Sequence, residues 1–389
     1  MTEKKVPFIE VKNLVVHYTS EGREIHAVND VSFSLEKGRT LGLVGETGAG
    51  KTTIAKSILR ILPEPPAHVD GGEICLEGKN LLELHNDEMR KIRGKRISMI
   101  FQDPMTALNP VMRIGNQIAE GIELHEKCSR KEAEAKAAAM LEMVGIPGTR
   151  FRDYPHQFSG GMKQRVIIAM ALACSPDLLL ADEPTTALDV TIQAQVLDII
   201  KTLQQRLQTA MIMITHDLGI VAEVCDEVAV IYAGEIVEYG SKEEIFDHPS
   251  HPYTIGLFGS LPDINSDVER LSPIAGMPPD PGNLPEGCSF SPRCPYASDK
   301  CRKGDVKLIN IGGTHPCRCI RAAAAEDKTA FSDGGQKKTA ENGNFRGPYL
   351  SDSFFHRLFS GIGSNSRDFQ KRRHYPGRCH PGLLSVCGK

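Results

Sequence analysis

The sequence predicts an α/β fold organised around a glycine-rich loop. This loop, GETGAGKTT at 45–53, follows an apolar run at 40–44 and precedes a helix-like stretch at 54–62. Two further apolar runs, at 178–181 and 210–215, end in acidic or histidine side chains, and helical patterns lie between them. Short buried strands that alternate with helices are typical of an α/β domain. The strand–loop–helix context is the one that a phosphate-binding loop requires.

The residue types of this loop suit the binding of a triphosphate. Gly45, Gly48 and Gly50 let backbone N–H groups converge on one anion, and the following helix adds the positive end of its dipole. Lys51 is expected to reach the β- and γ-phosphates, and the Thr52 hydroxyl can ligate Mg²⁺. The residues expected to contact the phosphates here are Gly45, Glu46, Thr47, Gly48, Ala49, Gly50, Lys51, Thr52 and Thr53.

Composition limits the classes of function. The chain has 389 residues, enough for one large domain with an extension or for two to three domains. Its formal charge of −3 gives no reason to expect a nucleic-acid partner. We find no run of about 18 apolar residues that would span a bilayer, and the N-terminus lacks the apolar core of a signal peptide. We therefore expect a cytoplasmic protein, whose eleven cysteines are not a disulfide framework.

The first part of the chain reads as strands. Residues 8–18 and 28–35 have partial alternation of apolar and polar side chains, with a polar linker at 19–26 between them. Tyr18 ends the first strand, where its ring can stack on a purine; a half-buried strand tyrosine is the alternative. Another short strand at 97–101 is followed by Gln102.

A helical insert is expected next. Residues 105–153 are mostly helical in pattern, Ser129 and Glu132 form a capping box, and Gly145 ends that helix. The segment FSGGMKQ at 158–164 then opens another helix. Its members Ser159, Gly160 and Gly161 offer a second anion site at a helix N-terminus, a weak signal when taken alone.

Two strands deliver the candidate catalytic residues. The run at 178–181 ends in Asp182 and Glu183, and two adjacent carboxylates at a buried strand end are costly unless they work with a cation or a water. Asp182 can hold Mg²⁺, whereas Glu183 can polarise a water for attack on phosphorus. His216 follows the strand at 210–215, where it is well placed to sense a γ-phosphate.

These segments, in this order, resemble the nucleotide-binding domain of ATP-binding cassette (ABC) transporters. The resemblance covers roughly residues 6–250, and its one departure is that Phe158 and Met162 stand where the family usually has Leu and Gln. The matching motifs are GETGAGKTT (Walker A), Gln102 (Q-loop), FSGGMKQ (signature), LLLADEP (Walker B), Ala187-Leu188-Asp189 (D-loop) and His216 (switch histidine).

The resemblance implies a P-loop NTPase fold: a RecA-like core, an antiparallel β subdomain and a helical subdomain at about 103–175. It implies that Tyr18 stacks on adenine, and that Ser159, Gly160 and Gly161 complete the ATP site of an opposite subunit. One chain carries one set of motifs, so catalysis implies a dimer, with itself or with a homologous ATPase. The implied catalytic residues are Glu183 and His216, and the implied Mg²⁺ ligands are Thr52, Gln102 and Asp182.

Residues 251–325 resemble the C-terminal extension of oligopeptide, dipeptide and nickel importer ATPases, beginning with HPYT at 251–254. This implies an ATP-hydrolysing subunit at the cytoplasmic face of the membrane that powers import of di- or oligopeptides. Its implied partners are a homologous ATPase, two transmembrane permease subunits and an extracytoplasmic solute-binding protein. Nickel or another small solute is the alternative cargo, since cargo is selected elsewhere in such a complex. A soluble non-transport ABC ATPase is the remote alternative.

The extension contains a cluster of cysteines. Cys288, Cys294 and Cys301 are spaced six and seven apart, and a fourth thiol follows in GGTHPCRCI. Four thiolates so close in a reducing compartment suggest a closed tetrathiolate site, with zinc or unliganded thiols as alternatives. The resemblance favours a [4Fe–4S] cluster with Cys319 as fourth ligand and Cys317 as the runner-up.

The tail, residues 326–389, does not resemble this family. It has six Ile, Leu or Val residues, and eleven Lys and Arg against six Asp and Glu. Such a composition cannot bury a core, so we expect disorder.

Overall fold

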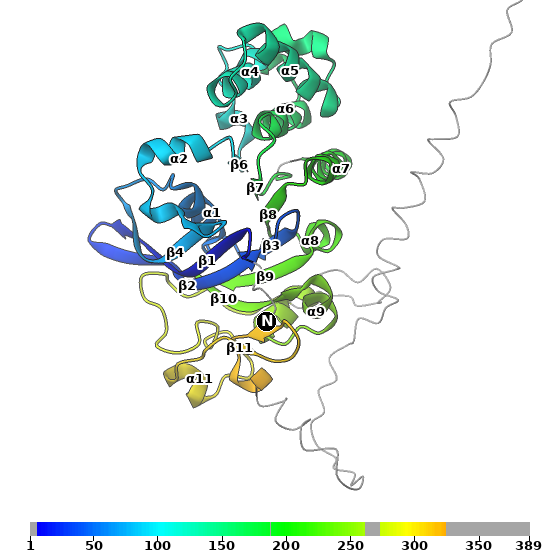
Figure 1. Cartoon of the computed structure of the whole chain (residues 1–389). Coiled ribbons are helices and arrows are strands. Elements are labelled where there is room, and N and C mark those ends of the chain that lie inside the picture. Colours follow the sequence, from blue (N-terminus) through cyan, green and yellow to red (C-terminus); the bar gives the residue numbers. More distant parts are fainter. Residues whose placement is uncertain (1–5, 187, 261–272, 324–389) are drawn as a thin grey trace, which may run out of the picture. The chain divides into compact units, whose positions relative to one another are not determined.

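The computed structural model describes residues 6–186, 188–260 and 273–323, all of which belong to one compact unit (Figure 1). The tail at 326–389 and Ala187 of the predicted D-loop lie outside the described residues. Within the described residues, no helix is both long and apolar enough to cross a membrane.

A mixed eight-stranded sheet forms the centre of the unit, in the order β11-β12-β10-β9-β3-β8-β7-β6. The five strands from β9 to β6 pair in parallel. Every residue of the three middle strands is buried, which explains why these segments read as continuous apolar runs. The five strands are β3 (Thr40–Val44), β6 (Ile97–Ile100), β7 (Leu178–Asp182), β8 (Ala210–Thr215) and β9 (Glu227–Tyr232).

A second, antiparallel sheet has the order β2-β1-β4-β5. The expected polar linker at 19–26 is shorter than predicted: both strands continue into it, and only Glu21 and Gly22, with φ of 52° and 75°, make the turn. Polar residues can extend these strands because their side chains face solvent while the backbones of β1 and β2 continue to pair. The strands are β1 (Ile9–Ser20), β2 (Arg23–Leu35), β4 (Ala67–Leu76) and β5 (Lys79–Asn80).

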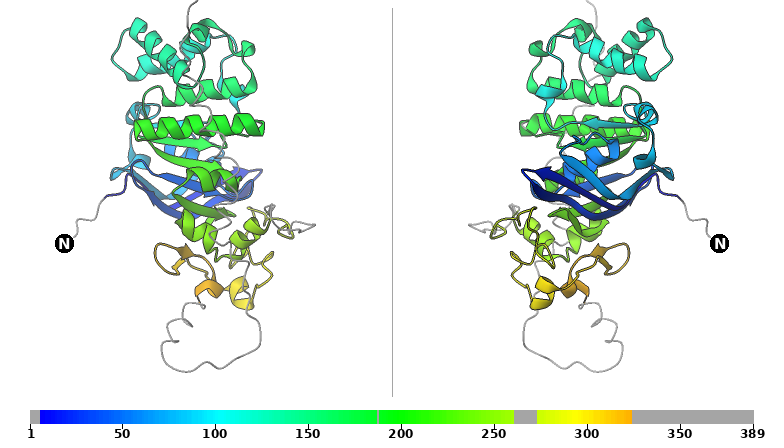
Figure 2. Two further views of the ribbon diagram at one scale, coloured as in Figure 1. Left: turned by 90° about the vertical axis from the view of Figure 1, so that its right-hand side faces the viewer. Right: turned by 90° about the vertical axis from the view of Figure 1, so that its left-hand side faces the viewer.

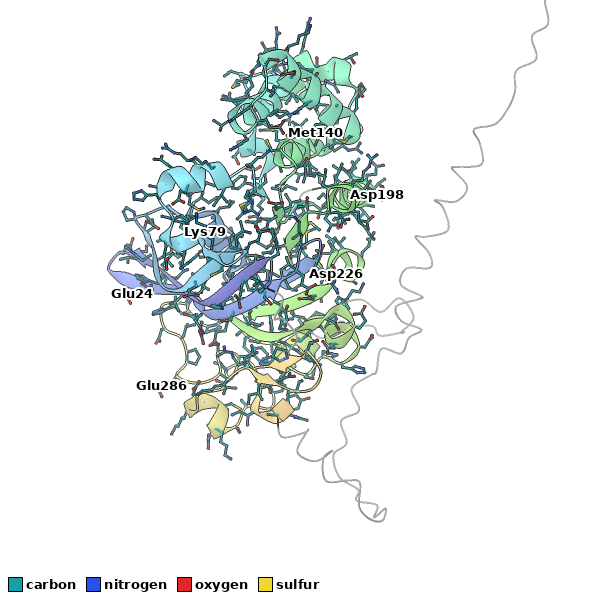
Figure 3. All side chains as sticks on the ribbon, in the orientation of Figure 1. Glu24, Lys79, Met140, Asp198, Asp226 and Glu286 are labelled. Carbon is teal, nitrogen blue, oxygen red and sulfur yellow. The ribbon has the colours of Figure 1, made fainter. Side chains whose placement is uncertain are left out.

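The two sheets share one apolar core. Helix α1 (Lys51–Leu59) contributes Ile54, Ala55 and Ile58, which are buried with residues from strands of both sheets. Asp226 (labelled in Figure 3) precedes β9 and accepts a hydrogen bond from the backbone N–H of Thr40 at 2.8 Å, which fixes the start of β3. The helices that flank the sheets are η1 (Leu81–Glu83), α2 (Asn86–Ile92), α7 (Val190–Leu207) and α8 (Leu218–Val224).

The predicted helical insert is present. Its helices gather beyond β6 at one end of the sheet (Figure 1). The capping box forms as expected, with the Ser129 N–H donating to Glu132 Oε2 at 2.7 Å, and Gly145 at φ 78° follows the end of α5. The helices are α3 (Pro104–Ala107), α4 (Ile114–His125), α5 (Arg130–Met143), η2 (Gly148–Arg152), η3 (Pro155–Gln157) and α6 (Gly160–Leu172).

The C-terminal extension is joined to the far edge of the central sheet, opposite the insert (Figure 2). Glu238 on β10 is fully buried and accepts hydrogen bonds from the N–H groups of Ser250 and His251 and from Nε2 of His315. One buried carboxylate thus holds both ends of the extension, while the domain boundary near 250 stays a prediction. The elements before the extension are β10 (Glu235–Ser241) and α9 (Lys242–Asp247), and those of the extension are α10 (Pro252–Gly259), α11 (Asp299–Lys303), β11 (Ile309–Asn310) and β12 (Pro316–Cys317).

Candidate active site

The glycine-rich loop connects β3 to α1 and is enclosed by neighbouring backbone. A Cβ atom on Gly45 would lie 2.1 Å from the carbonyl oxygen of Ile231, and one on Gly50 would lie 2.2 Å from that of Ala27. Gly50 also has a φ of 98°, so both positions require glycine. The loop is therefore confined between β9, which contains Ile231, and β2, which contains Ala27.

Lys51 lies inside this loop. Its ammonium group donates to the carbonyl oxygens of Gly45 at 2.7 Å and Glu46 at 2.8 Å. Burial lowers the pKa of Lys51, although the carboxylates of Glu183, Asp182 and Glu46 act in the opposite direction. A buried cation whose partners are two neutral carbonyls is well suited to exchange them for phosphate oxygens.

Two of the three predicted Mg²⁺ ligands lie together. The Thr52 hydroxyl at the start of α1 donates to Oδ1 of Asp182 at the end of β7, over 3.1 Å. Asp182 is buried, and this burial raises its pKa. A carboxylate and a hydroxyl are oxygen ligands of the kind that Mg²⁺ prefers, so this pair fits the ion. The third predicted ligand, Gln102, directs its amide nitrogen to Glu183 instead, over 2.9 Å.

Glu183 is the meeting point of three donors. It accepts from Gln102 at 2.9 Å, from the Thr186 hydroxyl at 2.9 Å, and from Nδ1 of His216 at 3.2 Å. Burial alone raises its pKa, but the hydrogen bonds from Thr186, His216 and Gln102 outweigh burial and lower the pKa overall. The structure therefore brings the two predicted catalytic residues together and keeps the carboxyl group ionised.

The backbone of Glu183 is also unusual. Its φ is 46°, in the left-handed region, and its N–H donates to the carbonyl oxygen of Ile214 on β8 at 2.8 Å. Strained backbone of this kind concentrates at functional sites, where the surrounding structure over-determines it. Thr186 was not identified from the sequence; a hydroxyl three residues after a strand-end acid is the signal that points to it.

Tyr18 lies beside the loop. Its hydroxyl is 3.3 Å from that of Thr53, and its side chain is half-buried on β1. This places the ring next to the first turn of α1, so both interpretations of Tyr18 remain compatible with its position. Purine stacking stays a prediction.

The signature segment lies at the start of α6. Ser159 caps that helix by accepting from the N–H of Met162 at 3.4 Å, and both Ser159 and Gly160 are exposed. Among the described residues, no hydrogen bond or ion pair joins them to the glycine-rich loop. The atypical Phe158 is buried under the guanidinium of Arg150, 4.2 Å from the ring centroid, which explains why an aromatic residue is accepted there.

The predicted cysteine ligands surround one cavity. Cys288, Cys294, Cys301 and Cys319 all line it, whereas Cys317 is fully buried in β12, outside this lining. Burial raises the pKa of the Cys288 thiol to about 11. In the part of the chain that the structure describes, no group of three or more His, Cys, Asp or Glu side chains is arranged to hold a metal ion. The four thiols are thus gathered, but a metal site is not shown.

Comparison with protein families gives two matches. A family model described as ABC transporter matches residues 28–186, and one described as oligopeptide/dipeptide transporter, C-terminal region, matches residues 237–301. The oligopeptide transport ATP-binding protein OppD of Bacillus subtilis is 50% identical over 310 residues, which are 79% of this chain and 87% of OppD. The dipeptide transport ATP-binding protein DppD of the same organism is 52% identical over 295 residues, 75% of this chain and 88% of DppD.

Solved structures agree with these matches. The dimeric post-hydrolysis state of the ATP-binding cassette MJ0796, bound to ADP and Pi, covers 60% of this chain with 98% of its own length, at a TM-score of 0.55 and 25% identity. The dimeric structure of MJ0796, a bacterial ABC transporter cassette, has a TM-score of 0.54 and 26% identity, with the same coverage. These likenesses confirm the predicted fold class. The chain belongs to the ABC transporter family, as an ATPase of the branch that carries the oligopeptide/dipeptide transporter C-terminal region.

Proposed function

We propose that this chain hydrolyses ATP at the loop of residues 45–53 to power the import of di- or oligopeptides. The observation that carries the proposal is the constellation at the end of β7, where Glu183 lies with His216 and Gln102 while Asp182 next to it faces Thr52. The relatives named for oligopeptide and dipeptide transport, at 50% and 52% identity, support the choice of cargo.

The geometry supports the following division of roles. The loop amides and Lys51 bind the triphosphate, and Tyr18 stacks on the adenine ring. Thr52 and Asp182, with the amide oxygen of Gln102, would hold Mg²⁺, which neutralises charge on the phosphates. Glu183 is ionised, so it can take a proton from water once at least one of its three donors releases it.

The site is proposed to work as a pair of cassettes. Ser159, Gly160 and Gly161 lie on the insert, and a second chain would bring its own such segment to this chain's phosphates. That both MJ0796 structures are dimeric supports this arrangement. The proposed assembly adds a homologous ATPase, two permease subunits and an extracytoplasmic solute-binding protein, with this chain at the cytoplasmic face of the membrane.

We further propose that Cys288, Cys294, Cys301 and Cys319 hold a [4Fe–4S] cluster, which would cross-link the loops of the extension. Each thiolate of such a cluster binds a different iron, so its sulfurs lie further apart than four ligands of one ion. The gathering of the four thiols around one cavity supports this proposal. The position of Cys317 in β12 favours Cys319 as the fourth ligand.

The proposed peptide import and the proposed [4Fe–4S] cluster are tested by separate experiments. With the companion subunits in vesicles, ATP-dependent uptake of labelled di- and oligopeptides is expected; uptake of nickel alone would overturn the cargo. For the cluster, anaerobically purified protein should show visible absorption, four irons and four sulfides per chain, and Cys319→Ser should abolish these signals while Cys317→Ser retains them. A featureless spectrum with one zinc per chain would overturn it.

A further inference from the structure

The C-terminal extension holds the second residue of the glycine-rich loop in two ways. The backbone N–H of Glu46 donates to the hydroxyl of Tyr253 on α10 at 2.9 Å. The Glu46 carboxylate receives two hydrogen bonds from Arg293, from Nη1 at 2.8 Å and from Nη2 at 3.1 Å. A bidentate pair between guanidinium and carboxylate is among the stronger and more directional contacts in proteins. The extension therefore fixes both the main chain and the side chain of this loop residue.

Arg293 is itself held rigidly. Its side chain is only 5% exposed, and beyond Glu46 it donates to the carbonyl oxygens of Ala275 at 3.1 Å and Ile274 at 3.3 Å, and to the hydroxyl of Tyr232 at 3.3 Å. These contacts leave the guanidinium one orientation. Little conformational entropy remains to be lost when it binds Glu46, so the contact acts as a fixed support.

The support rests on a buried aromatic cluster made of Tyr232, Tyr253 and Phe290. The ring centroid of Tyr253 is 4.6 Å from that of Tyr232 and 5.5 Å from that of Phe290, and all three side chains are buried. The Arg293 N–H donates to the carbonyl oxygen of Phe290 at 3.0 Å, which ties the arginine backbone to the same cluster. The extension thus meets the loop with packed rather than mobile residues.

The contact bears on phosphate binding because of what else Glu46 does. Its carbonyl oxygen accepts from the ammonium group of Lys51 at 2.8 Å. The residue that Arg293 holds by its side chain is therefore one of the two that position Lys51. A shift of Glu46 would move the loop amides and the lysine together.

We propose that Arg293 is a positioning residue for the ATP site: by fixing Glu46 it holds the loop in the conformation that binds triphosphate. This rests on the proposed role of the loop in ATP binding. It makes nucleotide affinity a property of the C-terminal extension as well as of the cassette, although the extension contributes no side chain to the predicted ATP contacts.

The test replaces Arg293 by methionine in the full-length chain. Binding of a fluorescent ATP analogue with Mg²⁺, the KM and kcat of ATP hydrolysis, and the Tm are measured. We expect Kd and KM to rise roughly tenfold, equivalent to about 1.4 kcal/mol, with kcat changed less than twofold. Arg302→Met is the matched control, because Arg302 is exposed in the same extension and its ion pair is a 3.4 Å contact to Asp299. The Arg302→Met variant should bind the ATP analogue with the affinity of the wild type.

Glu46→Gln and the double variant complete a cycle. If Arg293 acts through Glu46, the double variant should bind ATP no more weakly than Arg293→Met alone. If Arg293→Met does not fold, Glu46→Gln carries the test, with at least a threefold rise in Kd expected. A lower Tm with unchanged Kd, or additive losses in the cycle, would overturn the proposal. A wild-type chain that fails to bind the analogue would instead refute the ATP site itself.

Discussion

Replacing Glu183 by glutamine should separate ATP binding from ATP hydrolysis. The substitution keeps the shape of the side chain and removes the group that accepts a proton from water, a contribution worth about 10²- to 10⁴-fold in rate. Among the described residues, Glu183 accepts no hydrogen bond from the loop that binds the phosphates, so ATP affinity should not fall. In the wild-type chain, Glu183 accepts hydrogen bonds from three donors. An amide nitrogen in the place of Oε2 would face the donors of Gln102 and Thr186 and cost roughly 1–3 kcal/mol of stability, whereas in the place of Oε1 it could donate to the other tautomer of His216.

The assay compares wild type, Glu183→Gln and Glu134→Gln in the full chain with its companion subunits. Glu134 on α5 has a partly exposed side chain whose 2.9 Å ion pair with Arg130 lies within that helix, so Glu134→Gln should leave all readouts unchanged. Phosphate release, ATP-analogue binding and urea unfolding are measured together. Turnover within threefold of the wild type would refute the assignment of Glu183 as general base. Loss of ATP binding together with turnover would show that Glu183 acts in binding.

Two further predictions concern the same site. Thr186→Val removes one donor from Glu183, so the pKa of that carboxyl rises and the acid limb of the kcat–pH profile should move to higher pH; an unmoved limb would contradict the role of Thr186. Gly50→Ala should abolish ATP-analogue binding and lower stability by about 1–3 kcal/mol, because its Cβ would lie 2.2 Å from the carbonyl oxygen of Ala27 at a φ of 98°. Gly121→Ala on α4, where nothing lies within 4 Å, is the control and should leave binding and stability close to wild type.

The parts of the site that could be predicted are those whose chemistry is contiguous in sequence. The strand, the loop and the first turn of α1 lie within 40–59, so glycines, lysine and threonine appear there in the order in which they act. The acids at the end of β7 are similarly visible, since a buried apolar strand that ends in carboxylates conflicts with burial unless they serve a function. The contact between Thr52 and Asp182 follows once β3, which precedes the loop and α1, and β7, which ends in Asp182, are placed in one parallel sheet.

The contacts between the C-terminal extension and the glycine-rich loop could not be predicted. Glu46 and Arg293 are 247 positions apart, and neither segment has a pattern that requires the other. The turn at 21–22 was hidden for a different reason: the polar residues around it suit an exposed two-stranded ribbon as well as they suit a loop. The gathering of Cys319 rather than Cys317 at the cavity depends on the pairing of β12 with β10, a register that spacing alone does not reveal.

The position of Gln102 links the chemistry of Glu183 to the helical insert. Gln102 lies between β6 and α3, next to the start of the insert, whereas the N–H of Glu183 donates to the carbonyl oxygen of Ile214 on β8. A displacement of the insert that carries the glutamine away removes a donor from the carboxylate and raises its pKa. The same displacement frees Oε2 from that donor, which makes it a stronger proton acceptor. A displacement of the insert that separated Gln102 from Glu183 would therefore change the basicity of this carboxylate.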